Sequence, residues 1–327
     1  MTAEEGPWIK PHGSRSDGTT KRIAPKSTKS EGIRKDDIEV RSGNLIFSFG
    51  FPGSGKTTFQ WFLINYLMNE GDFLTKIEVT ETSHDNAWDG REIINEWKRL
   101  WIEGRLPAAT PVEEGAIREV HCTVTPRSGQ TKPLSFRFLE VSGELLRMAL
   151  PQQGRRPDVA GTIKSYLNNK QMKFVLALML HPDVEENDML FPSFISYLEK
   201  EFPEALDRMS LAIIISKPQK SFERLCSFGS SDGRFNYDRF DEEAIEDYVN
   251  RFCGETYQIF NSWPNARKTM IAPLDIGDME LEEGELRLRQ ARYDHISNIF
   301  SWIYEQFNQV SLGRTFLQKI MDRLKFK

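Results

Sequence analysis

Residues 50–57 read Gly-Phe-Pro-Gly-Ser-Gly-Lys-Thr and match the pattern GxxxxGK[ST] at every defined position. The glycines allow a tight turn in which consecutive backbone N–H groups point at one spot. A helix that starts at such a turn adds the positive end of its dipole, so the unit binds phosphate oxygens. The motif therefore predicts a buried strand, a phosphate-binding loop and a helix in direct succession.

Both flanks of the motif fit this prediction. Residues 45–49 form a short apolar run that is typical of a buried strand. Apolar side chains at helical spacing follow the loop, at Phe59, Phe62, Leu63, Tyr66 and Leu67. We expect nucleotide contacts from Gly50, Pro52, Gly53, Ser54, Gly55, Lys56, Thr57 and Thr58.

Two side chains of the loop have specific chemistry. Lys56 would supply a full positive charge to the β- and γ-phosphates, and the hydroxyl of Thr57 would bind Mg²⁺. The expected cofactors are therefore Mg²⁺ and a nucleoside triphosphate. The loop by itself does not choose between ATP and GTP.

The rest of the chain alternates apolar runs with helical patterns. The runs lie at 174–180, 211–216 and 269–272, and the helical patterns at 90–104, 192–201, 241–260 and around 296–307. Two further strand-like runs, 118–125 and 134–141, flank a Ser-Gly turn and predict an antiparallel pair. Together these patterns predict an α/β P-loop NTPase fold, with a mostly parallel sheet, helices on both faces and one antiparallel hairpin strand.

Three segments differ in composition. Residues 1–41 are polar and predict a disordered or loosely docked arm. Residues 42–310 form the P-loop domain, and 311–327 a C-terminal basic amphipathic helix, whose apolar side chains are Phe316, Leu317, Ile320, Met321 and Leu324. That helix, over 314–327, suits an anionic membrane surface, an acidic groove on a partner or the surface of its own domain.

Net charge and cysteine usage narrow the function classes. A net charge of −5 gives no reason to expect a sequence-specific nucleic-acid partner. The three cysteines are scattered, which argues against a disulfide framework or a zinc site. No secretory signal or membrane-spanning run is visible, so we expect a cytoplasmic protein that is at most peripheral to a membrane.

A second anchor for Mg²⁺ is expected at the end of an apolar strand. Phe138-Leu-Glu-Val-Ser-Gly-Glu144 places Glu140 where it would reach the metal, through water. The backbone N–H of Gly143 would contact the γ-phosphate, and Glu144 would orient the attacking water. Glu140 as a solvent-facing carboxylate is the alternative.

Glu140-x-x-Gly143 resembles the DxxG motif of translation-factor and Ras-like GTPases, with Glu in place of Asp. Ser216-Lys-Pro-Gln219, at the end of an apolar run, resembles their guanine-reading NKxD motif. The resemblance implies base contacts from Ser216, Lys217 and Gln219. The Gln219 amide lacks the charge that binds guanine in that family, and Asp275 is a candidate substitute.

A narrower resemblance covers Trp101–Thr110, which is similar to the "double-GTPase" proteins of bacterial conflict systems. It implies that Thr110 is the switch threonine, adding an oxygen to Mg²⁺ and the γ-phosphate; an ordinary loop threonine is the alternative. Glu144 replaces the water-orienting glutamine, so turnover should be slow. Three arginines follow, Arg147, Arg155 and Arg156. One of them would neutralise the γ-phosphate charge; a solvated basic loop is the alternative.

These features predict a molecular switch that binds and slowly hydrolyses GTP with Mg²⁺. It would signal to a protein partner through segments that the γ-phosphate orders, in a bacterial defence system if the narrower resemblance holds. One alternative is an ATP-dependent small-molecule or nucleotide kinase. The other is a scaffold that holds nucleotide without hydrolysis.

Overall fold

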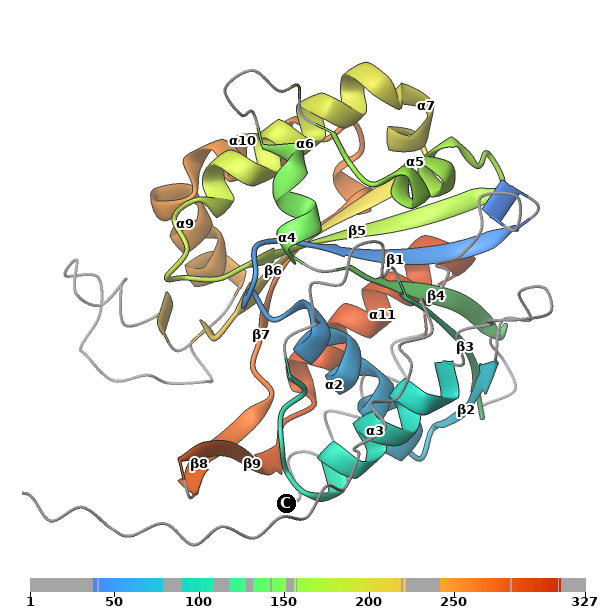
Figure 1. The fold of residues 1–327 in the computed structure, drawn as a ribbon, viewed down its shortest axis with the longest axis vertical. Coiled ribbons are helices and arrows are strands. Elements are labelled where there is room, and N and C mark those ends of the chain that lie inside the picture. The colour runs from blue at the N-terminus through green and yellow to red at the C-terminus, as the bar shows by residue number, and fades with distance from the viewer. Residues whose placement is uncertain are drawn as a thin grey trace, which may run out of the picture.

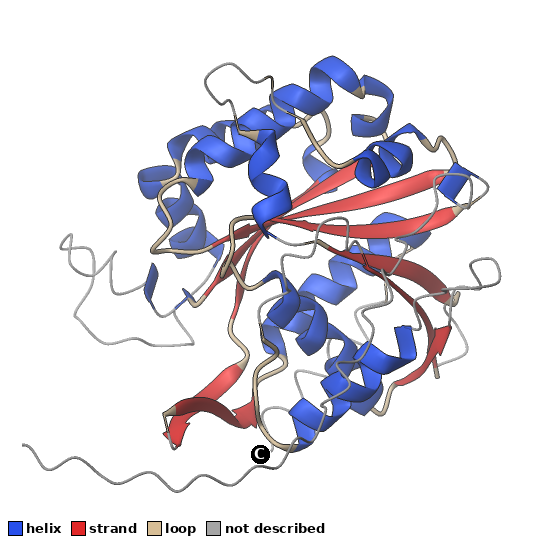
Figure 2. Cartoon of the chain, viewed as in Figure 1, coloured by secondary structure: helices blue, strands red, loops and turns tan. Residues whose placement is uncertain are grey.

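The computed structural model describes residues 38–39, 41–78, 90–108, 118–127, 132–141, 143–150, 156, 158–218, 220–221, 242–282, 284–310 and 312. A seven-stranded sheet in the order β2-β3-β4-β1-β5-β6-β7 crosses the molecule, with helices on both faces (Figures 1 and 2). Its strands are β1 Gly43–Phe49, β2 Phe73–Glu78, β3 Arg118–Pro126, β4 Leu134–Glu140, β5 Met172–Leu180, β6 Met209–Ser216 and β7 Thr269–Leu274.

The sheet is mostly parallel. Strands β4, β1, β5, β6 and β7 run in one direction, and β3 runs against both of its neighbours, β2 and β4. Both faces of β5 and β6 are covered, which explains their nearly continuous runs of Val, Ile, Leu and Met. The predicted α/β P-loop fold with its antiparallel hairpin is confirmed, whereas β2 was not predicted.

Each face of the sheet has its own helical layer. Below the sheet in Figure 1 lie α2 Lys56–Asn69, α3 Gly90–Ile102 and α11 Asp294–Asn308. Above it lie α4 Gly143–Leu146, η1 Arg147–Ala149, α5 Gly161–Asn168, α6 Asn187–Glu201, α7 Pro203–Leu206, α9 Glu242–Phe252 and α10 Gly254–Ser262. The helical pattern over 241–260 is thus two helices, because the backbone of Cys253 leaves the helical region at φ −142° and ψ 55°.

A two-stranded hairpin, β8 Gly277–Glu282 and β9 Glu285–Ala291, stands apart from the main sheet and was not predicted (Figure 1). Its residues alternate, so one face is apolar and the other carries paired Glu and Arg side chains. An isolated hairpin is marginally stable in water. This one is tied to the domain where the N–H of Leu288 donates to the carbonyl of Gly104 at 2.6 Å.

The chain just before β1 is packed into the domain. Ile38 is fully buried, and the side-chain amide of Asn169 donates to the carbonyls of Ile38 and Arg41. Arg41 itself is buried and forms an ion pair with Glu119 of β3. Residues 1–37 and the predicted helix at 314–327 lie outside the described residues. None of the described helices is long and apolar enough to cross a bilayer.

Candidate functional site

The phosphate-binding motif lies at the carboxyl end of β1, in the middle of the sheet. Residues 50–55 connect β1 to the first turn of α2, between the ends of β4 and β5 (Figure 1). The loop closes through a hydrogen bond from the N–H of Ser54 to the carbonyl of Phe51, at 3.2 Å. The predicted strand, loop and helix therefore follow one another as the motif requires.

Gly55 is one of the loop glycines that cannot be replaced without strain. Gly55 has φ +88°, a left-handed conformation that residues with a Cβ rarely adopt. A Cβ at this position would also lie 3.2 Å from the Cβ of Ser216, at the end of β6. Gly55 thus lets the loop turn into α2 and lets the end of β6 approach it closely.

Lys56 is folded back onto the loop. Its Nζ donates to the carbonyls of Gly50 and Phe51, both at 2.9 Å. Burial lowers the pKa of the amine to about 8. The hydroxyl of Ser54 is also buried and has no hydrogen-bond partner among the described atoms. A buried cation and an unpaired hydroxyl beside a helix N-terminus fit the phosphates of a nucleotide.

The lowered pKa of Lys56 gives the site an expected pH dependence. Phosphate binding requires the protonated amine. The affinity for a nucleotide should therefore be highest well below pH 8 and should fall as the pH rises through the pKa of about 8. We expect the dissociation constant of a nucleoside triphosphate to be about tenfold higher at pH 9 than at pH 7. Fluorescence titration with a labelled nucleotide would measure this, and an equal affinity at both pH values would contradict it.

The end of β4 meets the phosphate loop. Gly143, at the start of α4, is so close to the loop that a Cβ there would lie 2.5 Å from the backbone nitrogen of Pro52. The structure therefore brings the predicted γ-phosphate contact, Gly143, to the loop. Glu140 and Glu144 occupy the backbone positions on either side of this contact. Their side chains lie outside the described part of the structure, so their roles remain predictions.

The predicted base-reading motif begins where β6 ends. The hydroxyl of Ser216 donates to the carbonyl of Leu180 at 3.2 Å, and Lys217 takes a left-handed conformation at φ +51°. Nζ of Lys217 lies 2.8 Å from Nε2 of His181, which follows β5. Burial lowers the pKa of both groups, and the charge of Lys217 lowers that of His181 further. This contact was not predicted, because it joins the ends of two strands.

The structure places some of the other predicted site residues. Asp275, the candidate substitute base reader, is buried, and its carboxylate accepts from the N–H of Gly277 and from Arg292. These bonds hold the carboxylate of Asp275 at the start of the β8–β9 hairpin. Thr57 and Thr58 lie in the first turn of α2 and are half-buried. Thr110, Arg155 and Gln219 lie outside the described residues.

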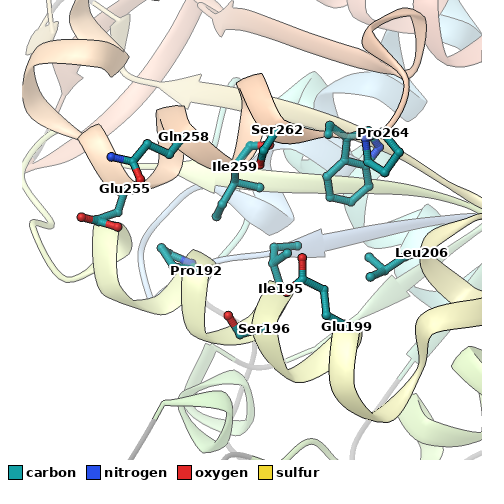
Figure 3. A pocket seen from close by; sticks show the side chains of 11 residues that line it. Pro192, Ile195, Ser196, Glu199, Leu206, Glu255, Gln258, Ile259, Ser262 and Pro264 are labelled. Carbon is teal, nitrogen blue, oxygen red and sulfur yellow. The ribbon is translucent and has the colours of Figure 1, made fainter.

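One described cavity is separate from this site. It has a volume of about 260 Å³ and opens between α6 and α10 (Figure 3). Ile195 and Ile259 face each other across it, and no residue of the phosphate loop lines it. Among the described residues no group of three or more His, Cys, Asp or Glu side chains could hold a metal.

Comparisons with known proteins add little to what the structure itself shows. No protein-family model matches the chain. No curated protein matches it either. Among solved structures, the signal recognition particle receptor SRb-GTP/SRX complex from Chaetomium thermophilum is 11% identical, with 72% of this chain and 90% of that chain covered at a TM-score of 0.30. A superposition this loose carries no inference about fold or function.

Proposed function

We propose that this protein binds a nucleoside triphosphate with Mg²⁺ at the loop 50–57 and acts as a GTPase-type switch. The observation that carries the proposal is the contact between Gly143 and Pro52. It places the end of β4 against the loop that would hold the phosphates. A change at the γ-phosphate would thus act directly on the segment that follows β4, which is how such switches couple nucleotide state to a protein contact.

The residues of the loop support the binding half of the proposal. Lys56 supplies charge, the N–H groups of the first turn of α2 supply donors, and Ser54 supplies an unpaired hydroxyl. Thr57 would hold Mg²⁺, which neutralises phosphate charge when bound. Thr110, Glu140 and Glu144 would complete the metal site and orient water, as the motifs predict.

The preference for GTP over ATP is the more specific part of the proposal. Lys217 follows β6, next to Ser216, whose Cβ lies beside Gly55. A base held there would contact the aliphatic stem of Lys217. It would also contact Gln219, which stands where the guanine-reading motif has an acidic residue. The role in bacterial defence and the protein partner are proposed from the resemblance of the motifs alone.

The deciding experiment is competition binding with Mg²⁺. Labelled GTP should bind the full chain, unlabelled ATP should compete weakly, and Lys56→Ala should weaken binding about 10- to 100-fold because a charge-assisted contact is lost. Lys164→Ala, a surface change on α5, is the control. Equal competition by ATP would overturn the GTP preference and favour an ATPase or kinase, and unaltered binding by Lys56→Ala would overturn the site.

A further inference from the structure

The cavity between α6 and α10 has an apolar floor and an acidic rim (Figure 3). Ile195 is 6% exposed and Trp263 is 9% exposed, and the half-buried side chain of Ile259 faces Ile195 across the cavity. Each wall adds one exposed glutamate, Glu199 on α6 and Glu255 on α10. None of the described residues that line the cavity is basic. Such a surface fits apolar side chains that are accompanied by cations.

The two walls of the cavity are fixed to each other. The carboxylate of Asp188, in the first turn of α6, accepts from the N–H groups of Glu255 at 3.3 Å and Thr256 at 2.8 Å. It thereby caps α10 and adds a third negative charge beside the cavity. Within the described part of the chain, no ion pair neutralises Glu199 or Glu255. The cavity is therefore a preformed acidic site.

The predicted helix at 314–327 has the complementary pattern. In a helix of 3.6 residues per turn its apolar side chains share one face, which is formed by Phe316, Leu317, Ile320, Met321 and Leu324. Lys319 and Arg323 lie along one border of that face. Arg314 and Lys325 lie along the other border. An apolar face with cations on both sides matches an apolar cavity with a carboxylate on each wall.

The chain just before this helix is held on the opposite side of the sheet. Leu312 is 5% exposed and packs in the core with α2, α3 and α11, whereas the cavity belongs to the helices on the other face. Phe316 follows Leu312 by four residues, which span at most about 14 Å. The path to the outside of the upper helices crosses the sheet and a helical layer, each about 10 Å thick. The same chain therefore cannot lay this apolar face along its own cavity.

We propose that the cavity between α6 and α10 takes the segment 314–327 of a second copy of this chain. The apolar face of the segment packs on the isoleucines and the tryptophan of the floor, and its basic borders lie against the two glutamates. Each copy offers one segment and one cavity, so the exchange is reciprocal and gives a closed, symmetric dimer. Because two such contacts form at once, the dimer is tighter than one contact alone would make it.

Sedimentation of the full chain over a range of concentrations tests this pairing. We expect dimers, and we expect the synthetic peptide 314–327 to convert them to monomers. Glu199→Lys and Glu255→Lys should each raise the dissociation constant of the dimer at least about tenfold, because like charges would then face each other. Glu96→Lys, at an exposed position of α3 on the opposite face of the sheet, is the matched control and should keep the wild-type value. Melting temperatures would show that the variants are folded.

A charge exchange tests the contact from both sides. Lys319→Glu combined with Arg323→Glu should also weaken the dimer. When these two changes are placed in one chain with Glu199→Lys, dimer formation should be partly restored, because opposite charges face each other again. Losses that simply add in the combined variant would show that the segment and the cavity do not meet.

The other occupants give different results. A wild-type chain that stays monomeric would overturn the proposal, as would dimers that neither the peptide nor the cavity variants weaken. Binding to anionic phosphatidylserine vesicles that Lys319→Glu with Arg323→Glu abolishes, in a chain that forms no dimer, would assign the segment to a membrane surface instead. An equal loss in Glu96→Lys would also overturn the proposal, because net charge would then explain the effect. Nucleotide binding should be unchanged in the cavity variants, so this test stands apart from that of the proposed function.

Discussion

A methyl group added at Gly143 should lower the rate of nucleoside-triphosphate hydrolysis about 100-fold, because a shift of about 1 Å in a positioned group is enough for such a loss. The Cβ of Gly143→Ala would lie 2.5 Å from the backbone nitrogen of Pro52 and 2.8 Å from its Cα. Backbone atoms cannot move aside as a flexible side chain can. The turn after β4 would have to leave the loop, and the N–H of residue 143 would lose its proposed contact with the γ-phosphate.

The control is another glycine at the start of a helix. Gly161 begins α5, and a Cβ there would meet nothing within 4 Å. Gly161→Ala should keep the wild-type hydrolysis rate, and both variants should retain binding of the diphosphate. Single-turnover assays and titrations with GDP and a non-hydrolysable GTP analogue would check this. Wild-type hydrolysis and wild-type triphosphate affinity in Gly143→Ala would show that the contact with Pro52 has no role at the site.

Glu119→Gln should destabilise the protein by about 3–5 kcal/mol, the usual result of removing one charge from a buried ion pair. Glu119 is 3% exposed and pairs with Arg41 and with Arg137, the latter at 3.2 Å. The hydroxyl of Tyr166 also donates to Glu119, and burial together with that carboxylate raises the pKa of Tyr166 above its usual range. Without the carboxylate, two guanidinium groups would share a mostly buried site with no anion.

Urea unfolding would measure the loss. Glu280→Gln is the matched control, because Glu280 pairs with Arg289 at 2.6 Å on the exposed hairpin and such surface pairs contribute about 1 kcal/mol or less. Adding Arg41→Gln to Glu119→Gln should recover part of the loss, since one uncompensated charge would be removed. A loss for Glu119→Gln no larger than that for Glu280→Gln would contradict the role assigned to the buried pair.

The predictable part of the fold is the part whose signal is local and strong. β1, β5 and β6 are mostly apolar, α2 is a mostly apolar helix that is buried on nearly all sides, and α11 carries a clear apolar stripe, so their residues alone indicate them. The unpredicted elements have weaker patterns. β2 is a short edge strand with half its side chains polar, and the β8–β9 hairpin alternates charged with apolar residues outside the sheet.

The candidate site likewise has a part that could be predicted from the sequence and a part that could not. The loop 50–57 could be recognised because a few adjacent residues carry its chemistry, and the spacing of Gly143 from Glu140 pointed to the loop. The contacts of Arg147 with Phe51 and of Lys217 with His181 join residues 96 and 36 positions apart in the sequence. Such pairs depend on which strands become neighbours and on how far each strand extends. No local pattern encodes that information.

The burial of Ile38 and Arg41 decides where the chain can be shortened. A fragment cut at residue 42, just before the strand that carries the loop, would remove a fully buried side chain and the guanidinium that pairs with Glu119. Such a fragment would lose binding through misfolding, and the loss would be mistaken for a missing nucleotide contact. Shortened versions meant for crystallisation or for titration should therefore begin before Ile38.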